Sequence, residues 1–165
     1  MSYTRELFNE MNRRAVSIAP ENKNFLDKLA KNKPKTLDKI VCELHYEEFE
    51  KVDCLECANC CKSLGPMLFE SDIDRLASTL KIKSSEFKDK YVRMDEDGDY
   101  VFKTMPCPFL SHDNICMVYN NRPKACREYP HTNRKRFYQV AQKTYYNIST
   151  CPAVYSIIDQ LKKKF

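Results

Sequence analysis

Apolar residues recur at helical spacing in two long stretches of the chain. Over residues 37–50 they return every three or four positions, at Leu37, Ile40, Val41 and Leu44. Residues 152–161 repeat the pattern, at Ala153, Val154, Ile157, Ile158 and Leu161. Pro34 and Pro152 stand where the beginning of a helix tolerates proline. The periodicity predicts two amphipathic helices, with Ser149 or Thr150 as the cap of the second.

Weaker patterns predict further helices. Two segments, 3–14 and 21–31, are separated by Pro20. Ser71 has an acid three residues later and precedes an apolar run, which resembles a capping box at the start of a short helix. Another short helix is expected to open at Ser84 or Ser85. The first half of the chain is therefore predicted to be largely helical.

Strand signals are few. Residues 100–103 alternate like a strand after an acidic turn at 95–99. Residues 105–119 carry a turn signal at 111–114 between short apolar runs, and a hairpin there would bring Cys107 and Cys116 together. The expected fold is mainly α with a short β-hairpin, in one small domain stapled by metal. An N-terminal helical extension over 1–53 would pack on a cysteine-cluster domain over 54–165.

Composition excludes several classes of protein. The 165 residues include only two glycines, so Gly-rich phosphate loops and dinucleotide fingerprints are excluded. A net charge of +5 and a pI near 8.7 argue against a nucleic-acid-binding domain. The basic runs at 134–136 and 162–164 are interpreted as a solvated face and a helix C-terminus. Neither a secretory signal nor a membrane span is visible, which favours a cytoplasmic protein.

Four of the nine cysteines stand within eight residues, at Cys54, Cys57, Cys60 and Cys61. Thiols this dense are usually held by a metal, an iron–sulfur cluster or disulfides. In a reducing compartment, metal is favoured over disulfide. Cys42 lies apart among apolar neighbours and is expected to be a small buried side chain. None of the three histidines (His45, His112 and His131) lies in a recognisable catalytic frame, so catalytic residues are not assigned.

If the cluster is one helix, Cys54, Cys57 and Cys61 fall on one face and Cys60 points aside. A second set lies downstream, at Cys107, Cys116, Cys126 and Cys151. The eight thiols could fill two four-thiolate sites, or hold one cluster and leave the rest free. All-thiolate coordination suits Zn²⁺ and iron–sulfur clusters alike. The spacing fits neither a simple ferredoxin nor a simple zinc ribbon.

The cysteines and their neighbours together carry a family resemblance. The residues concerned are the CxxCxxCC block at 54–61, Cys107-Pro108-Phe109-Leu110, Cys116, Tyr119, Arg122-Pro123, Cys126-Arg127, Tyr129-Pro130 and Cys151-Pro152. This pattern resembles the YkgJ-type cysteine-cluster family, a zinc- or iron-chelating domain. A related pattern occurs in flagellin lysine N-methylases. The resemblance covers about Cys54 to Pro152.

The resemblance implies that eight cysteines are metal ligands: Cys54, Cys57, Cys60, Cys61, Cys107, Cys116, Cys126 and Cys151. It adds four residues around them: Arg122, Arg127, Tyr119 and Tyr129. The arginines could offset the negative charge of four thiolates on one Zn²⁺. Zinc is the favoured ion, with iron or a [4Fe–4S] cluster as the alternative.

These observations favour a metal-binding protein whose metal is structural or is carried. Two alternatives stay open. One is an iron–sulfur redox or protein-modifying enzyme related to lysine methylation, although no fingerprint for a methyl donor is visible. The other is an interaction module for RNA or an acidic protein. The expected partner is a metal ion, and a protein partner is left unidentified.

Overall fold

Most of the described chain is helical, and it contains one short two-stranded β-hairpin. The computed structural model describes residues 5–165, which group into two compact units. Unit 1 comprises the described residues up to Cys57 together with Pro130–Phe165, and unit 2 comprises Ala58–Tyr129. The expected class, mainly α with a short hairpin, is confirmed. The expected division at residue 53 differs from these units and stays a prediction.

The described part of unit 1 is built from helices. They are α1 (Arg5–Ser17), α2 (Ala19–Asn32), α3 (Leu37–Phe49), α4 (Cys54–Cys57), the 3₁₀ helix η2 (Phe137–Val140), α9 (Ala141–Ile148) and α10 (Pro152–Lys162). Both long helices predicted from periodicity are present, and Pro20 lies in the first turn of α2. Residues 3 and 4 of the expected first helix lie outside the described residues.

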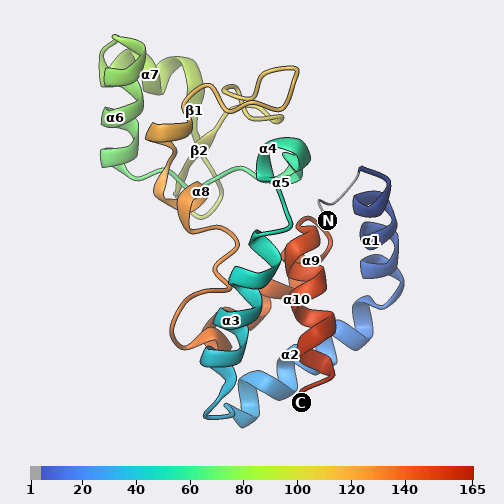
Figure 1. The fold of residues 1–165 in the computed structure, drawn as a ribbon. Coiled ribbons are helices and arrows are strands. Elements are labelled where there is room, and N and C mark those ends of the chain that lie inside the picture. The colour runs from blue at the N-terminus through green and yellow to red at the C-terminus, as the bar shows by residue number, and fades with distance from the viewer. Residues whose placement is uncertain (1–4) are drawn as a thin grey trace. The chain divides into compact units, whose positions relative to one another are not determined.

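The core of unit 1 forms where α10 packs against α3 and α9 (Figure 1). Its buried side chains include the predicted apolar positions Val41, Leu44, Val154, Ile157, Ile158 and Leu161. Burying an aliphatic side chain of this size contributes about 1.5–3 kcal/mol. The residue that caps α10 is Cys151 rather than Ser149 or Thr150, because Cys151 is the last residue in extended conformation before the helix. The core therefore fixes the place of this cysteine.

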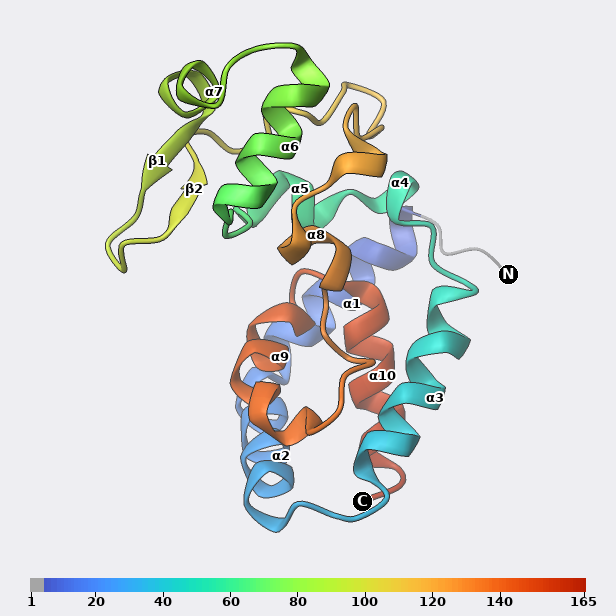
Figure 2. The ribbon, with the colours of Figure 1, turned by 90° about the vertical axis from the view of Figure 1, so that its left-hand side faces the viewer.

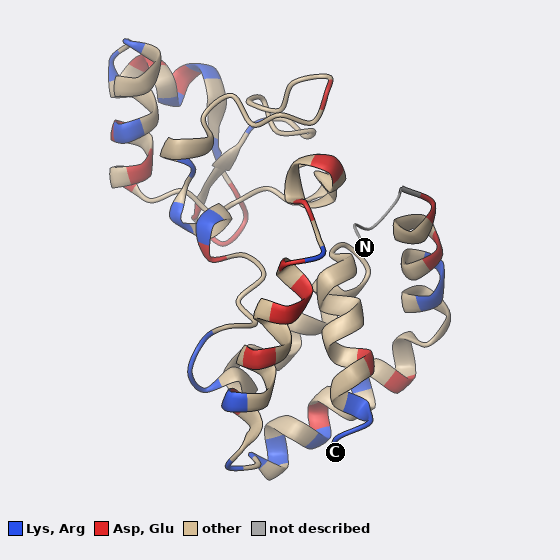
Figure 3. Cartoon of the chain, viewed as in Figure 1, with Lys and Arg blue, Asp and Glu red and all other residues tan. Residues whose placement is uncertain are grey.

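The two basic runs both lie in unit 1. Asp38 in the first turn of α3 accepts hydrogen bonds from the backbone N–H groups of Arg136 (2.6 Å) and Phe137 (2.9 Å). These bonds fasten the exposed basic loop before η2 to α3 (Figure 3). At the end of α10, the ammonium group of Lys162 lies 2.6 Å from the carboxylate of Glu21. The placement agrees with a solvated face and a helix C-terminus.

Unit 2 contains the hairpin and the remaining helices. The elements are α5 (Asn59–Ser63), α6 (Glu70–Leu80), α7 (Ser84–Tyr91), β1 (Val92–Met94), β2 (Tyr100–Phe102), the 3₁₀ helix η1 (Tyr119–Asn121) and α8 (Lys124–Glu128). β1 pairs antiparallel with β2, with Val92 opposite Phe102. The side chain of Asp95 accepts the N–H groups of Asp97 and Asp99 and so closes the predicted acidic turn.

An aromatic cluster makes up much of the unit 2 core, where α6 and α7 pack beside the hairpin (Figure 2). The ring of Phe109 lies 6.0 Å from that of Phe87 and 5.5 Å from that of Phe102, measured between centroids. Phe109 is 3% exposed and stands between Cys107 and Cys116 in the sequence. Its burial anchors the loop that carries both cysteines.

Two local features of unit 2 differ in detail from the sequence pattern. The regular hairpin spans residues 92–102, and the predicted turn within 105–119 is closed by a single antiparallel bridge between Leu110 and Cys116. The helix expected after Ser71 begins at Glu70, and the acid that serves its first turn is Asp72. The Asp72 carboxylate accepts the backbone N–H of Phe69 over 3.1 Å. The same carboxylate accepts the backbone N–H of Lys124, which is far away in the sequence. A local pattern cannot reveal this contact.

Within residues 5–165, no helix combines the length and apolar character that crossing a membrane requires.

Candidate metal centre

A left-handed residue interrupts the cysteine cluster. Helix α4 ends at Cys57, Ala58 follows with φ 49° and ψ 16°, and α5 then begins at Asn59. The hypothesis of one helix through the cluster is therefore wrong. Ala58 is 2% exposed, and burial of its methyl group helps to offset the roughly 1 kcal/mol that this conformation costs. The two compact units divide at the same place, so that Cys54 and Cys57 belong to unit 1 and the next two cysteines to unit 2.

Four thiols of unit 2 gather from three segments. Cys61 lies on α5, Cys107 and Cys116 flank the loop anchored by Phe109, and Cys126 lies on α8. The backbone N–H of Cys107 donates to the carbonyl of Cys61 over 2.8 Å. The charge of Cys61 acts on each of the other three thiols, and Cys107 and Cys116 also act on Cys126, which places all four in one neighbourhood. We call them the unit 2 thiol group.

Cys61 is the most acidic member of this group. The neighbouring thiol of Cys60 donates a hydrogen bond to it and lowers the pKa of Cys61 to about 7, against the opposing effect of burial. The positive charges of Arg122 and Lys62 lower this pKa further. The thiolate is the form of cysteine that can ligate a metal, and the lowered pKa favours this form at Cys61.

The other three thiols have raised pKa values. Burial is the main cause, and it raises the pKa of Cys107 to about 11 and that of Cys126 to about 12. Burial also raises the pKa of Cys116, and the negative charge of Cys61 adds to the effect in all three. Thiolates at these positions would repel one another. A cation among them would replace the repulsion by attraction and lower every pKa.

Of the four residues expected around the ligands, Arg122 acts directly on the thiols. Its charge lowers the pKa values of Cys61, Cys116 and Cys126 against the opposing effects. Its Nε donates to the carbonyl of Tyr119 over 2.8 Å, and its guanidinium carbon lies 3.6 Å from the centre of the Tyr119 ring. The tyrosine thus holds the arginine in place.

The other two expected neighbours support the backbone. The guanidinium group of Arg127 donates to the carbonyl of Arg122. The N–H of Tyr129 donates to the carbonyl of Ala125 over 3.1 Å at the end of α8, and the Tyr129 side chain is half-buried. Their role beside a metal stays a prediction.

Unit 1 holds a second group of three thiols. Cys54 and Cys57 lie three positions apart on α4, and Cys151 caps α10. Burial raises the pKa of Cys151 to about 12, and the thiols of Cys54 and Cys57 contribute. Hydrogen bonds from the backbone N–H groups of Val154 and Ala153 act in the opposite direction. We call these three cysteines the unit 1 thiol group.

Cys42 and the histidines belong to neither thiol group. Cys42 on α3 is half-buried, whereas a small buried side chain was expected. His112 is exposed, as expected for a turn. The Nδ1 of His45 lies 2.7 Å from the hydroxyl oxygen of Thr132, and burial lowers the pKa of His45.

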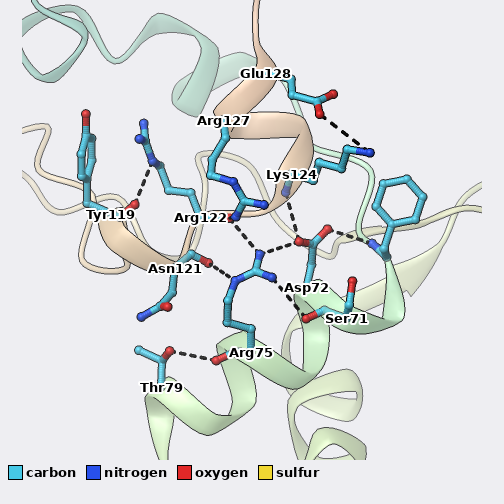
Figure 4. A network of polar contacts seen from close by, with 11 residues as sticks. Ser71, Asp72, Arg75, Thr79, Tyr119, Asn121, Arg122, Lys124, Arg127 and Glu128 are labelled. Carbon is cyan, nitrogen blue, oxygen red and sulfur yellow. Dashed lines mark hydrogen bonds and ion pairs between the residues drawn. The ribbon is translucent and has the colours of Figure 1, made fainter.

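The sequence interpretation missed the residues that hold α8. Asp72 and Arg75 on α6 bind the backbone just before and at the start of α8, where Cys126 lies (Figure 4). In the sequence, Asp72 directly follows Ser71 at the expected helix start and carries no other signal. No local signal could reveal its second role, because its partner Lys124 is far away in the sequence.

The donor set of unit 2 fits a thiophilic metal. Four cysteine sulfurs are the ligands that Zn²⁺ and iron–sulfur clusters prefer. Within residues 5–165, no three His, Cys, Asp or Glu side chains lie close enough together to hold an ion in their present positions.

A comparison with protein families agrees with this donor set. Residues 53–152 match the model of the CxxCxxCC family, described as a "putative zinc- or iron-chelating domain". Because the match covers more than half of the chain, the protein belongs to this family. No curated protein matches the chain. No solved structure matches it either.

Proposed function

We propose that this is a zinc-binding protein whose unit 2 holds one ion through Cys61, Cys107, Cys116 and Cys126. The observation that carries the proposal is the gathering of these four thiols from three segments of one compact unit. Four thiolates would complete a tetrahedral shell and leave no position for a reactive water. The ion would then serve to hold the segments together rather than to catalyse a reaction.

Charge balance supports the proposal. Four thiolates around one Zn²⁺ carry a formal charge of −2. The cationic side chains of Arg122 and Lys62 already act on Cys61 and would offset part of this charge. Such a site would contribute directly to the free energy of folding, because the unfolded chain lacks the preformed geometry.

The unit 1 thiol group provides a second candidate site. Cys54, Cys57 and Cys151 supply three thiols, and a metal bound there would have a position open for a fourth ligand. Cys60 is placed as a hydrogen-bond donor to Cys61, and its expected role as a ligand stays a prediction. The eight cysteines would thus act as a group of four, a group of three and one supporting thiol.

The incomplete thiol group also favours one alternative function. An iron–sulfur cluster held by three cysteines would keep one iron open to a substrate or redox partner, as an enzyme requires. This alternative concerns unit 1, whereas the closed group in unit 2 favours a structural ion.

Anaerobic purification followed by metal analysis and an absorption spectrum tests both readings. We expect a colourless protein with up to two zinc ions per chain. A brown protein with broad visible absorption would overturn the zinc proposal in favour of iron–sulfur. A chelator should also lower the urea concentration at which the protein unfolds. An unchanged unfolding midpoint after complete metal removal would contradict a structural ion.

A further inference from the structure

A buried ion pair on α6 reaches across unit 2. The side chain of Asp72 is 1% exposed, and its carboxylate lies 2.5 Å from Nη2 of Arg75. The same carboxylate accepts the backbone N–H of Phe69 (3.1 Å) and that of Lys124 (3.0 Å). Its charge is thus fully compensated by three donors, two local and one distant (Figure 4). We call Asp72 and Arg75 the α6 clamp.

Arg75 also binds the backbone of the segment that precedes α8. Its Nε donates to the carbonyl of Asn121 (3.3 Å), and its Nη2 donates to that of Arg122 (2.9 Å). Its Nη1 donates to the carbonyl of Ser71 on its own helix (3.4 Å). A planar guanidinium group can serve these acceptors at once, whereas an ammonium group cannot reproduce the forked geometry.

The clamped segment leads directly into α8. This helix has five residues, too few to be stable without outside contacts. Its first residue is Lys124, whose N–H has no acceptor inside the helix and is satisfied by Asp72. Cys126 follows two positions later. The place of its thiol in unit 2 therefore depends on α6.

The other thiols of the group have different supports. Cys107 is joined to Cys61 by a backbone hydrogen bond, and Cys116 is bridged to Leu110 beside the buried ring of Phe109. Cys126 is therefore the member whose helix is fastened by the clamp.

From this geometry we propose that the α6 clamp positions Cys126 as the fourth ligand of the unit 2 centre. Asp72 and Arg75 do not touch the metal; they are positioning residues that act through the backbone of Asn121–Lys124. The inference rests on the proposed function, because it assigns Cys126 to a metal. When the clamp is broken, Cys61, Cys107 and Cys116 remain gathered, and only Cys126 is lost as a ligand.

Cobalt substitution tests the ligand count. Thiolate-to-Co²⁺ charge-transfer absorption grows with the number of Co–S bonds. Asp72→Asn and Arg75→Lys should each lose as much of this absorption as Cys126→Ser does. Glu70→Gln is the matched control on α6, since it removes the ion pair between Glu70 and Lys88 of α7 (2.7 Å) but leaves the clamp intact. It should keep the wild-type spectrum.

Thiol labelling of the metal-free full-length chain tests the clamp independently. A short pulse of iodoacetamide, analysed by mass spectrometry, should label Cys126 several-fold faster in both clamp variants than in wild type. The labelling rate of Cys54 in unit 1 should not change. Circular dichroism identifies any variant that is unfolded throughout, and Arg75→Lys retains the positive charge as the milder of the two changes.

The outcomes separate the two proposals. A wild-type protein that takes up no cobalt or zinc would overturn the proposed function, and the ligand role of Cys126 with it. Metal uptake with the full cobalt spectrum in both folded clamp variants would overturn the positioning role alone. Labelling of Cys126 at the wild-type rate in both variants would also overturn it. Matched loss in Cys126→Ser and the clamp variants, together with faster labelling, would support it.

Discussion

The backbone N–H of Cys107 donates a hydrogen bond of 2.8 Å to the carbonyl oxygen of Cys61. The bond joins a short helix and a loop that are far apart in the sequence, and both residues carry thiols of the proposed centre. Main-chain bonding thus brings two proposed ligands together before any ion binds. Pre-organisation of this kind reduces the ordering that metal binding must impose.

Cys107→Ser should sharply weaken metal binding by unit 2. Losing an outer partner of a metal ligand typically lowers affinity by about 10–100-fold, so losing the ligand itself should cost at least that much. Competition with a chromophoric chelator measures the affinity. Cys42→Ser is the control, because Cys42 lies on α3 in unit 1 and belongs to neither thiol group. Equal affinity in both variants would contradict the proposed ligand set.

Asp72→Asn should destabilise the protein at neutral pH. Removing one partner of a buried ion pair costs about 3 kcal/mol or more, whereas the solvent-exposed pair broken by Glu70→Gln contributes little. Urea unfolding of both variants at pH 7 measures the difference. Similar free energies of unfolding would contradict the role assigned to the buried carboxylate.

The effect of Asp72→Asn should depend on pH. Burial alone would raise the pKa of Asp72, but hydrogen bonds from Arg75 and two backbone N–H groups outweigh it and lower the pKa. The carboxylate therefore stabilises the fold above the ordinary Asp pKa of about 4, and this contribution disappears as the pH falls through the lower native value. Wild type and variant should converge in strong acid, and a constant difference would contradict the lowered pKa.

The regular helices were predictable because one-dimensional periodicity reflects burial on one face. Val154, Ile157 and Leu161 return at helical spacing, and all three are buried in unit 1. The cysteines were recognisable by their number and by their family resemblance. The division of the cysteines into two groups was not predictable, because a single left-handed residue, Ala58, redirects the chain inside the motif. Alanine is a strong helix former, so its presence gave no warning of the break.

Long-range polar contacts were equally invisible in the sequence. An acid such as Asp72 is common in the first turn of a helix, yet the Asp72 carboxylate also accepts the backbone N–H of Lys124. Such a contact depends on how two segments pack, and no local pattern encodes it. The residues that support the candidate site were therefore harder to predict than the residues that form it.

His45 should make the stability of unit 1 sensitive to mild acid. Burial lowers its pKa, so the folded state disfavours the protonated ring while the unfolded chain binds a proton near pH 6.5. Stability is complete above that pH and declines as the pH falls below it. Urea unfolding midpoints at pH 7.5 and 5.5 should differ less in His45→Gln than in wild type. His112→Gln, at an exposed position, should keep the wild-type difference.

Substitutions at Ala58 distinguish a left-handed break from a continuous helix through the cysteine cluster. In a helix interior, glycine is less favourable than valine by a few tenths of a kcal/mol. At φ 49° the order reverses, because glycine adopts positive φ freely and a β-branched residue does not. Ala58→Val should therefore unfold at a lower urea concentration than Ala58→Gly, and it should bind less zinc per chain at limiting metal. A more stable valine variant would mean that Cys54, Cys57 and Cys61 share one helical face after all.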